Sequence, residues 1–171
     1  MIHLNIGSNL DSKFGNRLIN ISNAINLLIN SKLKIIKISN FFKTPSYPNK
    51  KHPYFLNVGV FANFESDEIT LLKLIKTIEK KIGRIKGKKN DPRVCDIDII
   101  DFKGLIIENK KIKVPHEKSH LRNFVLYPLL QIDPGWTHPI LKKNVKFFIN
   151  KLNQKSRIEI TRLNKNVIIK S

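Results

Sequence analysis

The sequence predicts a single domain of the α+β class, in which helices pack on a mixed or antiparallel sheet. Three observations support this prediction. Segments with strand and helix patterns follow one another as β-α-β-β-α-β over the first two thirds of the chain. The chain has 171 residues, enough to bury a core, and its single cysteine excludes an internal disulfide. The apolar fraction of 41% is too high for a disordered basic chain.

The first half of the chain predicts a strand, a helix and two further strands. Residues 1–6 are strand-like and end at a Gly-Ser-Asn turn. A helix with one apolar face is predicted next, from residues spaced by three or four, namely Phe14, Leu18, Ile21, Ile25 and Leu28. The β-branched segment 33–42 predicts a strand that Pro45 ends. After a polar loop at 46–53, residues 55–64 predict a second strand able to pair with the first.

A second helix and a third part of the sheet follow. Ser66 or Asp67 is a suitable N-cap, and Gly83 is a suitable stop. Between them lie the inward-facing positions Leu71, Leu74, Ile75, Ile78 and Ile82. After the basic loop 83–93, residues 96–102 predict another strand. The order is that of the ferredoxin-like split βαβ fold, an α/β sandwich.

The remaining residues are expected to extend this domain. A turn at 103–104 predicts a further short strand over 105–107. Residues 124–132 predict a short helix that Pro128 starts or interrupts.

Residues 145–171 form a C-terminal extension of the single domain 1–171, with no role evident from the sequence. Within it, residues 145–152 predict a helix, and 157–169 predict a strand or a hairpin that bends at 164–166.

The formal charge of +19 raises the possibility of a nucleic-acid partner. The composition favours a different explanation, because 26 Lys, 27 Ile and 19 Asn are typical of an AT-rich coding sequence. The lysines are also dispersed, whereas a nucleic-acid-binding arm is usually a dense block. No apolar run approaches the ~20 residues of a membrane span, and no secretory signal is expected. The lone Cys95 fits a reducing cytoplasm.

Two carboxylates on the strand 96–102 form the main candidate site. Asp96 and Asp98 are two residues apart, so both should lie on one face, whereas Asp101 is out of phase and is expected at the surface. Two converging carboxylates repel unless a cation lies between them, and Mg²⁺ prefers such oxygen ligands. By itself the pair also fits a half-exposed strand with a solvated face.

Arginines favour the site interpretation. Arg84, Arg93 and Arg122 are three of only six arginines, and all adjoin the carboxylate strand or its loops. Arginine forks that hold phosphate beside a metal are parts of a phosphoryl-transfer site. The loop lysines Lys86, Lys88 and Lys89 either close over a polyphosphate or are simply solvated. His116 either donates a hydrogen bond to phosphate or carries a proton.

Six segments resemble the 6-hydroxymethyl-7,8-dihydropterin pyrophosphokinase family, in family order from about residue 3 to residue 134. The most diagnostic is P-R-V-C-D-I-D-I at 92–99. The others are I-G-S-N-L at 6–10, F-F-K-T-P at 41–45, P-Y-F-L-N at 53–57, Glu79 with Gly83-Arg84, and V-P-H at 114–116 with Arg122, Phe124 and Pro128-Leu129.

The resemblance implies transfer of pyrophosphate from ATP to the pterin hydroxymethyl group, giving AMP, in tetrahydrofolate biosynthesis. It implies two Mg²⁺ ions on Asp96 and Asp98, and catalytic roles for Arg84, Arg93, Asp96 and Asp98. It implies ATP contacts from Glu79, Lys86, Arg93, Ile99, Lys111, Lys113, His116 and Arg122. It implies pterin contacts from Thr44, Pro45, Phe55, Asn57, Asp96 and Phe124. The expected partners are ATP and the pterin, with no nucleic acid or membrane, for a cytoplasmic monomer.

The chain departs from the family pattern at a few positions. Asn90-Asp91 replace an aromatic residue and a glycine, Glu117 replaces a common tyrosine, and Phe55 lacks the usual hydroxyl. Lys113 occupies a position that is often polar. Two other functions stay open from the residues alone: an RNA-binding module, for which no paired-aromatic motif is found, and a pterin-binding relative without catalysis.

Overall fold

The computed structural model describes residues 1–31, 33–47, 49–85, 87 and 91–170. Its main elements are β1 Ile2–Ser8, α1 Arg17–Asn30, β2 Lys34–Ile38, β3 Phe42–Thr44, β4 Phe55–Asn63, α2 Glu68–Ile82 and β5 Asp96–Phe102. They are followed by β6 Ile107–Glu108, β7 Lys113–Val114, the 3-10 turn η1 Ser119–Leu121, α3 Asn123–Ile132, α4 Val145–Lys151, α5 Gln154–Ile158 and β8 Thr161–Arg162.

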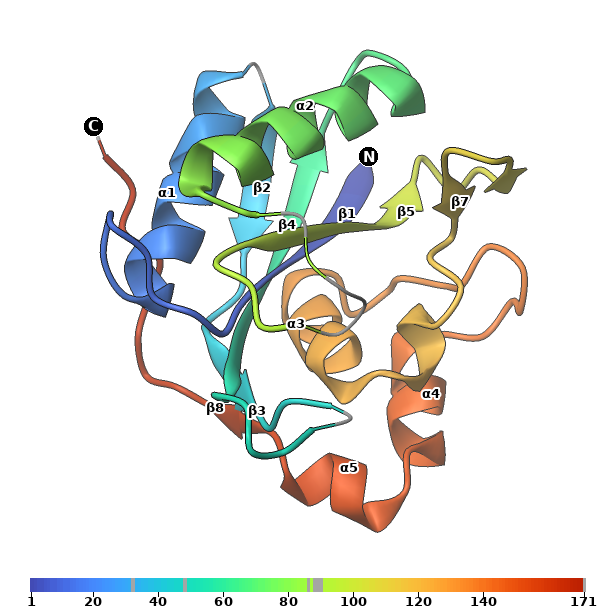
Figure 1. The fold of residues 1–171 in the computed structure, drawn as a ribbon. Coiled ribbons are helices and arrows are strands. Elements are labelled where there is room, and N and C mark those ends of the chain that lie inside the picture. Colours follow the sequence, from blue (N-terminus) through green and yellow to red (C-terminus); the bar gives the residue numbers. More distant parts are fainter. Residues whose placement is uncertain (32, 48, 86, 88–90, 171) are drawn as a thin grey trace.

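The main sheet has the predicted split order (Figure 1). Its strands run β5-β1-β4-β3-β8, and β2 also pairs with β4. Every pairing described for it is antiparallel. The α+β prediction is therefore confirmed, with antiparallel pairing, whereas the predicted β-α-β-β-α-β order gains one strand because the segment 33–42 forms both β2 and β3.

Helices cover both faces of the sheet, because the strands alternate between two apolar cores. The larger core joins α1 and α2 to the side chains of β1 and β4 that point toward them. The smaller core joins α3 and α4 to the opposite face. Among the described residues, no helix has the length and apolarity to cross a bilayer.

Both predicted long helices are present, and their ends follow from local hydrogen bonds. Asp67 caps α2 by accepting from the Thr70 N–H at 2.7 Å, and Gly83 ends it with a φ of 101°, which glycine adopts without strain. Asn16 caps α1 through the Ile19 N–H. Because α1 starts at Arg17, the prediction that Phe14 belongs to its apolar face is wrong, and Phe14 is exposed.

Helix α3 lies close to the sheet because Gly59 on β4 has no side chain. A Cβ at this position would lie 2.9 Å from Pro128 Cβ and 3.0 Å from Ile132 Cδ1. Pro128 is therefore part of the packed face of a continuous helix, and neither starts nor interrupts it. This close approach positions the start of α3 beside β5, where the candidate site lies.

Three predicted strands differ from the structure. The segment 33–42 forms two strands because Ser39 interrupts it. The Ser39 N–H donates to the Gly59 carbonyl, and the Ser39 Oγ accepts from the Gly59 N–H. The strand predicted at 105–107 is β6, one to two residues later, and it pairs with β7. The strand or hairpin predicted at 157–169 is reduced to the short strand β8, which lies between α5 and an extended tail.

That tail is held against α1 by side chains. The Ile168 N–H donates to Ser22 Oγ, while the Asn26 amide donates to the Ile168 carbonyl and accepts from the Lys170 N–H. Such bonds depend on tertiary contact and leave no periodic signal in the sequence.

Asp101 is buried, so the prediction that it lies at the surface is wrong. The cause is a bulge: Leu4 pairs with Ile99 and His3 pairs with Asp101, which leaves Ile100 as an additional residue on β5. The shift turns Asp101 toward the smaller core, where it accepts from Trp136 Nε1 and from the Gly104 N–H, each at 2.8 Å.

We expect Gly59→Ala to lower the free energy of unfolding by about 2 kcal/mol, because its methyl group overlaps the backbone and ring of Pro128. Urea unfolding followed by the fluorescence of the single Trp136 measures this change. Gly135→Ala is the matched control, since its nearest neighbour to a Cβ is 3.7 Å away. Equal stability of the two variants would contradict the close packing of α3.

Candidate active site

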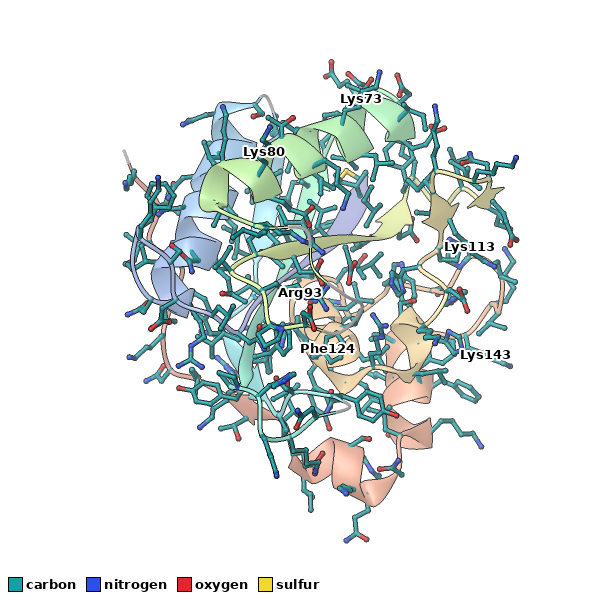
Figure 2. The ribbon with its side chains drawn as sticks, in the orientation of Figure 1. Lys73, Lys80, Arg93, Lys113, Phe124 and Lys143 are labelled. Carbon is teal, nitrogen blue, oxygen red and sulfur yellow. The ribbon has the colours of Figure 1, made fainter. Side chains whose placement is uncertain are left out.

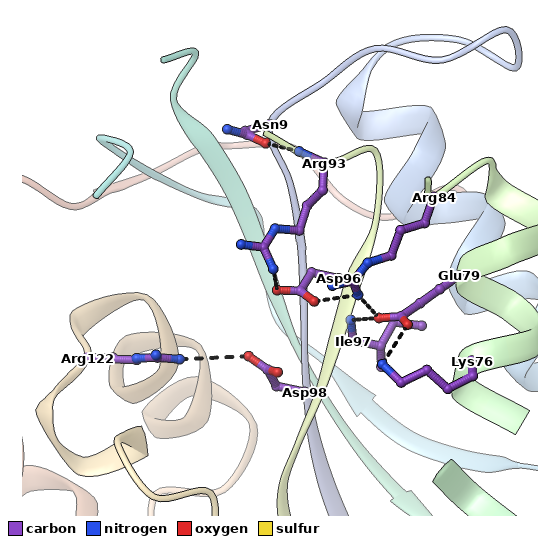
Figure 3. Close-up of polar contacts among 9 residues, drawn as sticks. All are labelled: Asn9, Lys76, Glu79, Arg84, Arg93, Asp96, Ile97, Asp98 and Arg122. Atoms are coloured by element: carbon purple, nitrogen blue, oxygen red, sulfur yellow. Dashed lines mark hydrogen bonds and ion pairs between the residues drawn. The ribbon is translucent and has the colours of Figure 1, made fainter. Parts of the chain in front are cut away.

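The predicted carboxylate pair lies on one face of β5, as its spacing requires (Figure 3). Asp96 pairs in register with Gly7, and Asp98 pairs with Asn5, both before the bulge at Ile100. Their side chains are 24% and 29% exposed, so each is open to a ligand on one side only. The start of α3 faces them across the site.

All three candidate arginines are brought to these two carboxylates. Arg84 donates to Asp96 Oδ1 at 2.6 Å, and Arg93 donates to Asp96 Oδ2 at 2.9 Å. Arg122 Nη1 lies 3.9 Å from Asp98 Oδ2. Asp96 is therefore held between two guanidinium groups, one on each oxygen (Figure 3).

Glu79 lies beneath this arrangement rather than at its surface. Its side chain is 3% exposed, and it bonds Arg84, Lys76 Nζ at 3.0 Å and the Ile97 N–H at 2.9 Å. Burial alone would lower the pKa of Arg84, but Asp96 and Glu79 raise it above its usual value. These contacts of Glu79 fix Arg84 and the start of β5.

Asp98 differs from Asp96 in its electrostatic surroundings. Burial, followed by the nearby Asp96 carboxylate, raises the pKa of Asp98 to about 7, although Arg122 and Arg93 oppose the shift. The guanidinium of Arg122, 3.9 Å away, compensates the charge of Asp98 only in part, which suits this carboxylate to accept a cation.

The residues fit a bound magnesium polyphosphate. The Arg93 Nε is buried without a hydrogen-bond partner, so this donor is left for an acceptor such as a phosphate oxygen. Among the described residues, no group of three or more His, Cys, Asp or Glu side chains converges to hold a metal ion. Asp96 and Asp98 would supply two ligands, and phosphate oxygens and water would complete the set.

His116 is positioned by the backbone of β5. Its N–H donates to the Ile100 carbonyl at 2.9 Å, and its Nδ1 accepts from the Lys118 N–H at 3.1 Å. Burial, followed by the charge of Arg122, lowers the pKa of His116 and so favours the neutral ring. With Nδ1 as acceptor, the proton of the neutral ring is on Nε2, which is then available as a donor.

Of the residues expected to contact the pterin, Thr44, Phe55 and Asn57 lie on β3 and β4, and Phe124 lies at the start of α3. Asn57 Nδ2 donates to Thr44 Oγ1 at 3.3 Å, and both residues are buried. Gly7 leaves room for this amide, because a Cβ there would lie 3.0 Å from Asn57 Oδ1. Phe55 and Phe124 are half-buried, and the guanidinium of Arg122 lies 5.4 Å from the Phe124 ring.

The other residues predicted to contact ATP or the pterin are buried in the core, exposed or paired elsewhere, or lie outside the described residues. Ile99 is in the larger core, so a nucleotide would meet only its backbone. Lys111 and Pro45 are exposed, and Lys113 Nζ pairs with Glu108 at 2.7 Å. Lys86, and with it Lys88, Lys89 and Asn90 of the same loop, lies outside the described residues.

The C-terminal extension lines two recesses beside β3. One, of about 350 Å³, includes Thr44, Pro45, Glu159 and Thr161. The other, of about 310 Å³, lies by Phe42 and Tyr127 under Arg157 and Arg162. Neither recess includes Asp96 or Asp98, so the phosphate chemistry and these hollows are separate features.

Asn9 and Ser46 join segments of the site, because Asn9 bonds both Arg93 and Ser46. The sequence predicts no contact for either residue, although Asn9 belongs to the I-G-S-N-L segment. A polar residue directly after a buried strand was the available signal, since a buried amide must find partners.

Comparison with known proteins agrees with this geometry. The chain matches the family model described as 7,8-dihydro-6-hydroxymethylpterin-pyrophosphokinase over residues 3–134. It is 37% identical over 147 residues to the 2-amino-4-hydroxy-6-hydroxymethyldihydropteridine pyrophosphokinase of Aquifex aeolicus, covering 86% of this chain and 89% of that one.

Longer proteins contain a similar region. Folic acid synthesis protein FOL1 of Dictyostelium discoideum is 36% identical over 143 residues, but these are 82% of this chain and 21% of FOL1. The crystal structure of wild-type HPPK-DHPS from Plasmodium falciparum superposes with a TM-score of 0.70 at 16% identity, covering 94% of this chain and 47% of that one. The likeness to that structure concerns the fold.

We expect Asp98→Asn to stabilise the ligand-free protein increasingly as pH rises from 4.5 to 8. Because the folded pKa of about 7 lies above the unfolded value, the folded state binds more protons between these values. The wild type therefore loses stability as pH rises, and the variant does not. Urea unfolding in EDTA should show a gain at pH 8 that exceeds the gain at pH 4.5 by about 3 kcal/mol, because each pH unit up to the folded pKa contributes about 1.4 kcal/mol. A gain independent of pH would show that Asp98 is charged throughout.

Proposed function

The chain belongs to the 7,8-dihydro-6-hydroxymethylpterin-pyrophosphokinase family and transfers a pyrophosphoryl group to hydroxymethyldihydropterin in folate biosynthesis, and we propose that magnesium-bound ATP is the donor. AMP is then the second product. The observation that carries this proposal is the pair Asp96 and Asp98 on one face of β5, with three arginines directed at it. The other activities of the longer relatives are not attributed to this chain.

The carboxylate pair is the part of the site that would hold the metal. Bound magnesium would neutralise phosphate charge and activate the attacking hydroxyl. The raised pKa of Asp98 supports its role, because a cation would offset the unfavourable charge there. We propose two Mg²⁺ ions, since the ATP triphosphate and the pterin hydroxyl must both be held against the carboxylates of Asp96 and Asp98.

The arginines would bind the transferred phosphates. Arg93 has one nitrogen on Asp96 and a buried Nε without a partner, so it can bridge the carboxylate to a phosphate oxygen. Arg84 is held by Glu79 and Asp96 close to the same place. His116, through Nε2, and Arg122 would add donors from the α3 side.

Residues of β3 and β4 would bind the pterin, which accepts the pyrophosphoryl group. The buried Thr44 and Asn57 already share one hydrogen bond, and their remaining groups can read the edge of a pterin. Phe55 and Phe124 would stack on its ring. Lysines around the molecule would attract ATP by a long-range field that weakens with salt.

The composition and surface favour an enzyme over an RNA-binding module. The lysines labelled in Figure 2 point outward from α2, β7 and the 133–144 loop, so the charge is spread over different elements. A nucleic-acid site requires a concentrated basic face. We further propose a cytoplasmic monomer that needs no nucleic acid or membrane, and these points stay predictions.

We expect Asp96→Ala and Asp98→Ala each to reduce AMP formation from Mg-ATP and hydroxymethyldihydropterin at least 100-fold, because each removes a charge positioned for the transition state. Chromatography of AMP measures the rate, and circular dichroism checks the fold. Asp11→Ala, on an exposed loop, is the control and should keep the wild-type rate.

Two results would contradict the proposal. Full activity of either carboxylate variant would remove the metal assignment. Salt-sensitive RNA binding by a wild-type protein that forms no AMP would favour the RNA-binding module, and pterin binding without AMP would favour a relative that has lost catalysis.

A further inference from the structure

Asn9 lies directly after β1 and is 2% exposed. Its Oδ1 accepts from the Arg93 N–H at 2.7 Å, and its own N–H donates to the Arg93 carbonyl at 3.1 Å. Its Nδ2 donates to Ser46 Oγ at 3.2 Å and to the Pro53 carbonyl at 3.3 Å. One buried amide therefore joins three segments that are far apart in the sequence.

The first of these segments leads to the phosphate side of the site. Arg93 lies three residues before Asp96, and its guanidinium bonds that carboxylate at 2.9 Å. Because both the N–H and the carbonyl of Arg93 are bonded to Asn9, the backbone from which this guanidinium extends is fixed relative to β1.

The second segment is the root of the loop between β3 and β4. Ser46 Oγ also donates to the Pro53 carbonyl at 2.5 Å, which closes the loop at its base. Thr44 comes just before this base, and Phe55 and Asn57 come just after it. The residues assigned to the pterin are therefore held by the bond between Ser46 and Pro53 that closes the loop, and Asn9 bonds both of these residues.

The two ends of the Asn9 side chain have different chemistry, and each matches its partner. The oxygen must face the Arg93 N–H, and the nitrogen must face the two oxygen acceptors. An aspartate at position 9 would lack the N–H donor, and a serine side chain would be too short to reach the partners on both sides. Leaving the buried Arg93 N–H or the loop oxygens without hydrogen bonds would cost stability, so the Arg93 segment and the loop base keep one relative position.

We propose that Asn9 is a positioning residue that aligns the pterin-holding loop with the phosphate-holding Arg93. It touches neither substrate. Transfer requires the hydroxymethyl oxygen and the attacked phosphorus to meet in line, and an error of about 1 Å in such placement lowers the rate on the order of 100-fold. The inference rests on the proposed function, because it takes the roles of the two segments from it.

The test compares Asn9→Ala with a matched buried asparagine. Asn40 also joins three segments, through Gln131, Asn166 and the Lys165 carbonyl, and none of these contacts involves Arg93 or the loop base. We expect Asn9→Ala to lower kcat on the order of 100-fold, and Asn40→Ala to keep kcat and both KM values within about threefold at a similar loss of stability.

Ser46→Ala separates the two ends of the amide. It removes the bond from Asn9 to Ser46 and the closing bond from Ser46 to the Pro53 carbonyl. The bonds from Asn9 to Arg93 and to the Pro53 carbonyl remain, so we expect the KM for the pterin to rise about fivefold while the KM for ATP is unchanged. In the double variant with Asn9→Ala, the effect on the pterin KM should be less than the product of the single effects, because both changes remove the same link.

Amide hydrogen exchange provides a readout that does not depend on turnover. In Asn9→Ala, the Arg93 amide should exchange at least tenfold faster than in the wild type and in Asn40→Ala. Unchanged protection of Arg93, or kinetic constants equal to those of Asn40→Ala, would overturn the positioning role. A wild type that forms no AMP would instead overturn the proposed function, while the exchange result still decides the structural link.

Discussion

The site depends on the Asp96 carboxylate, whose two oxygens are bonded by two different arginines. The arginines come from either side of a single loop, Arg84 at the end of α2 and Arg93 just before β5, so the ion pairs fix both ends of the loop against the sheet. Glu79 supports the arrangement from below by bonding Arg84 and the Ile97 N–H together. Two bonded arginines compensate Asp96, whereas Asp98 has Arg122 at 3.9 Å and its pKa is raised by burial and by Asp96. The asymmetry leaves one carboxylate anchored in the protein and the other open to a cation.

A single bulge at Ile100 of β5 allows this strand to present Asp96 and Asp98 to the site and also to place Asp101 in the smaller core. Before Ile100, alternation keeps Asp96 and Asp98 together on the face toward α3. After it, Asp101 turns into the smaller core and bonds Trp136, which a regular strand would have prevented. The Ile100 carbonyl is left to accept the His116 N–H, so the same irregularity positions a donor beside the carboxylates.

The features that the sequence predicts well are those with a local cause. Helix α2 has a capping aspartate, an apolar period and a terminal glycine, and β5 has a period-two carboxylate pair. The features that it does not predict depend on partners distant in the chain. Ser39 breaks a strand by bonding Gly59, Asp101 is turned inward by a bulge, and the tail is held by Asn26. The convergence of Asn9, Ser46 and Arg93 is of the same kind, because no periodicity in the sequence records a contact across 84 positions.

The distribution of cations explains why a net charge of +19 is compatible with a small-molecule enzyme. Lysine is a flexible point charge, and here it lies on the outside of several elements (Figure 2). Arginine offers a planar fork, and three of the six arginines are bonded or adjacent to the two site carboxylates. Geometry at the site is therefore set by arginine, and lysine contributes a diffuse field outside it. Salt should weaken the diffuse field far more than the buried pairs, because screening acts mainly on exposed charges.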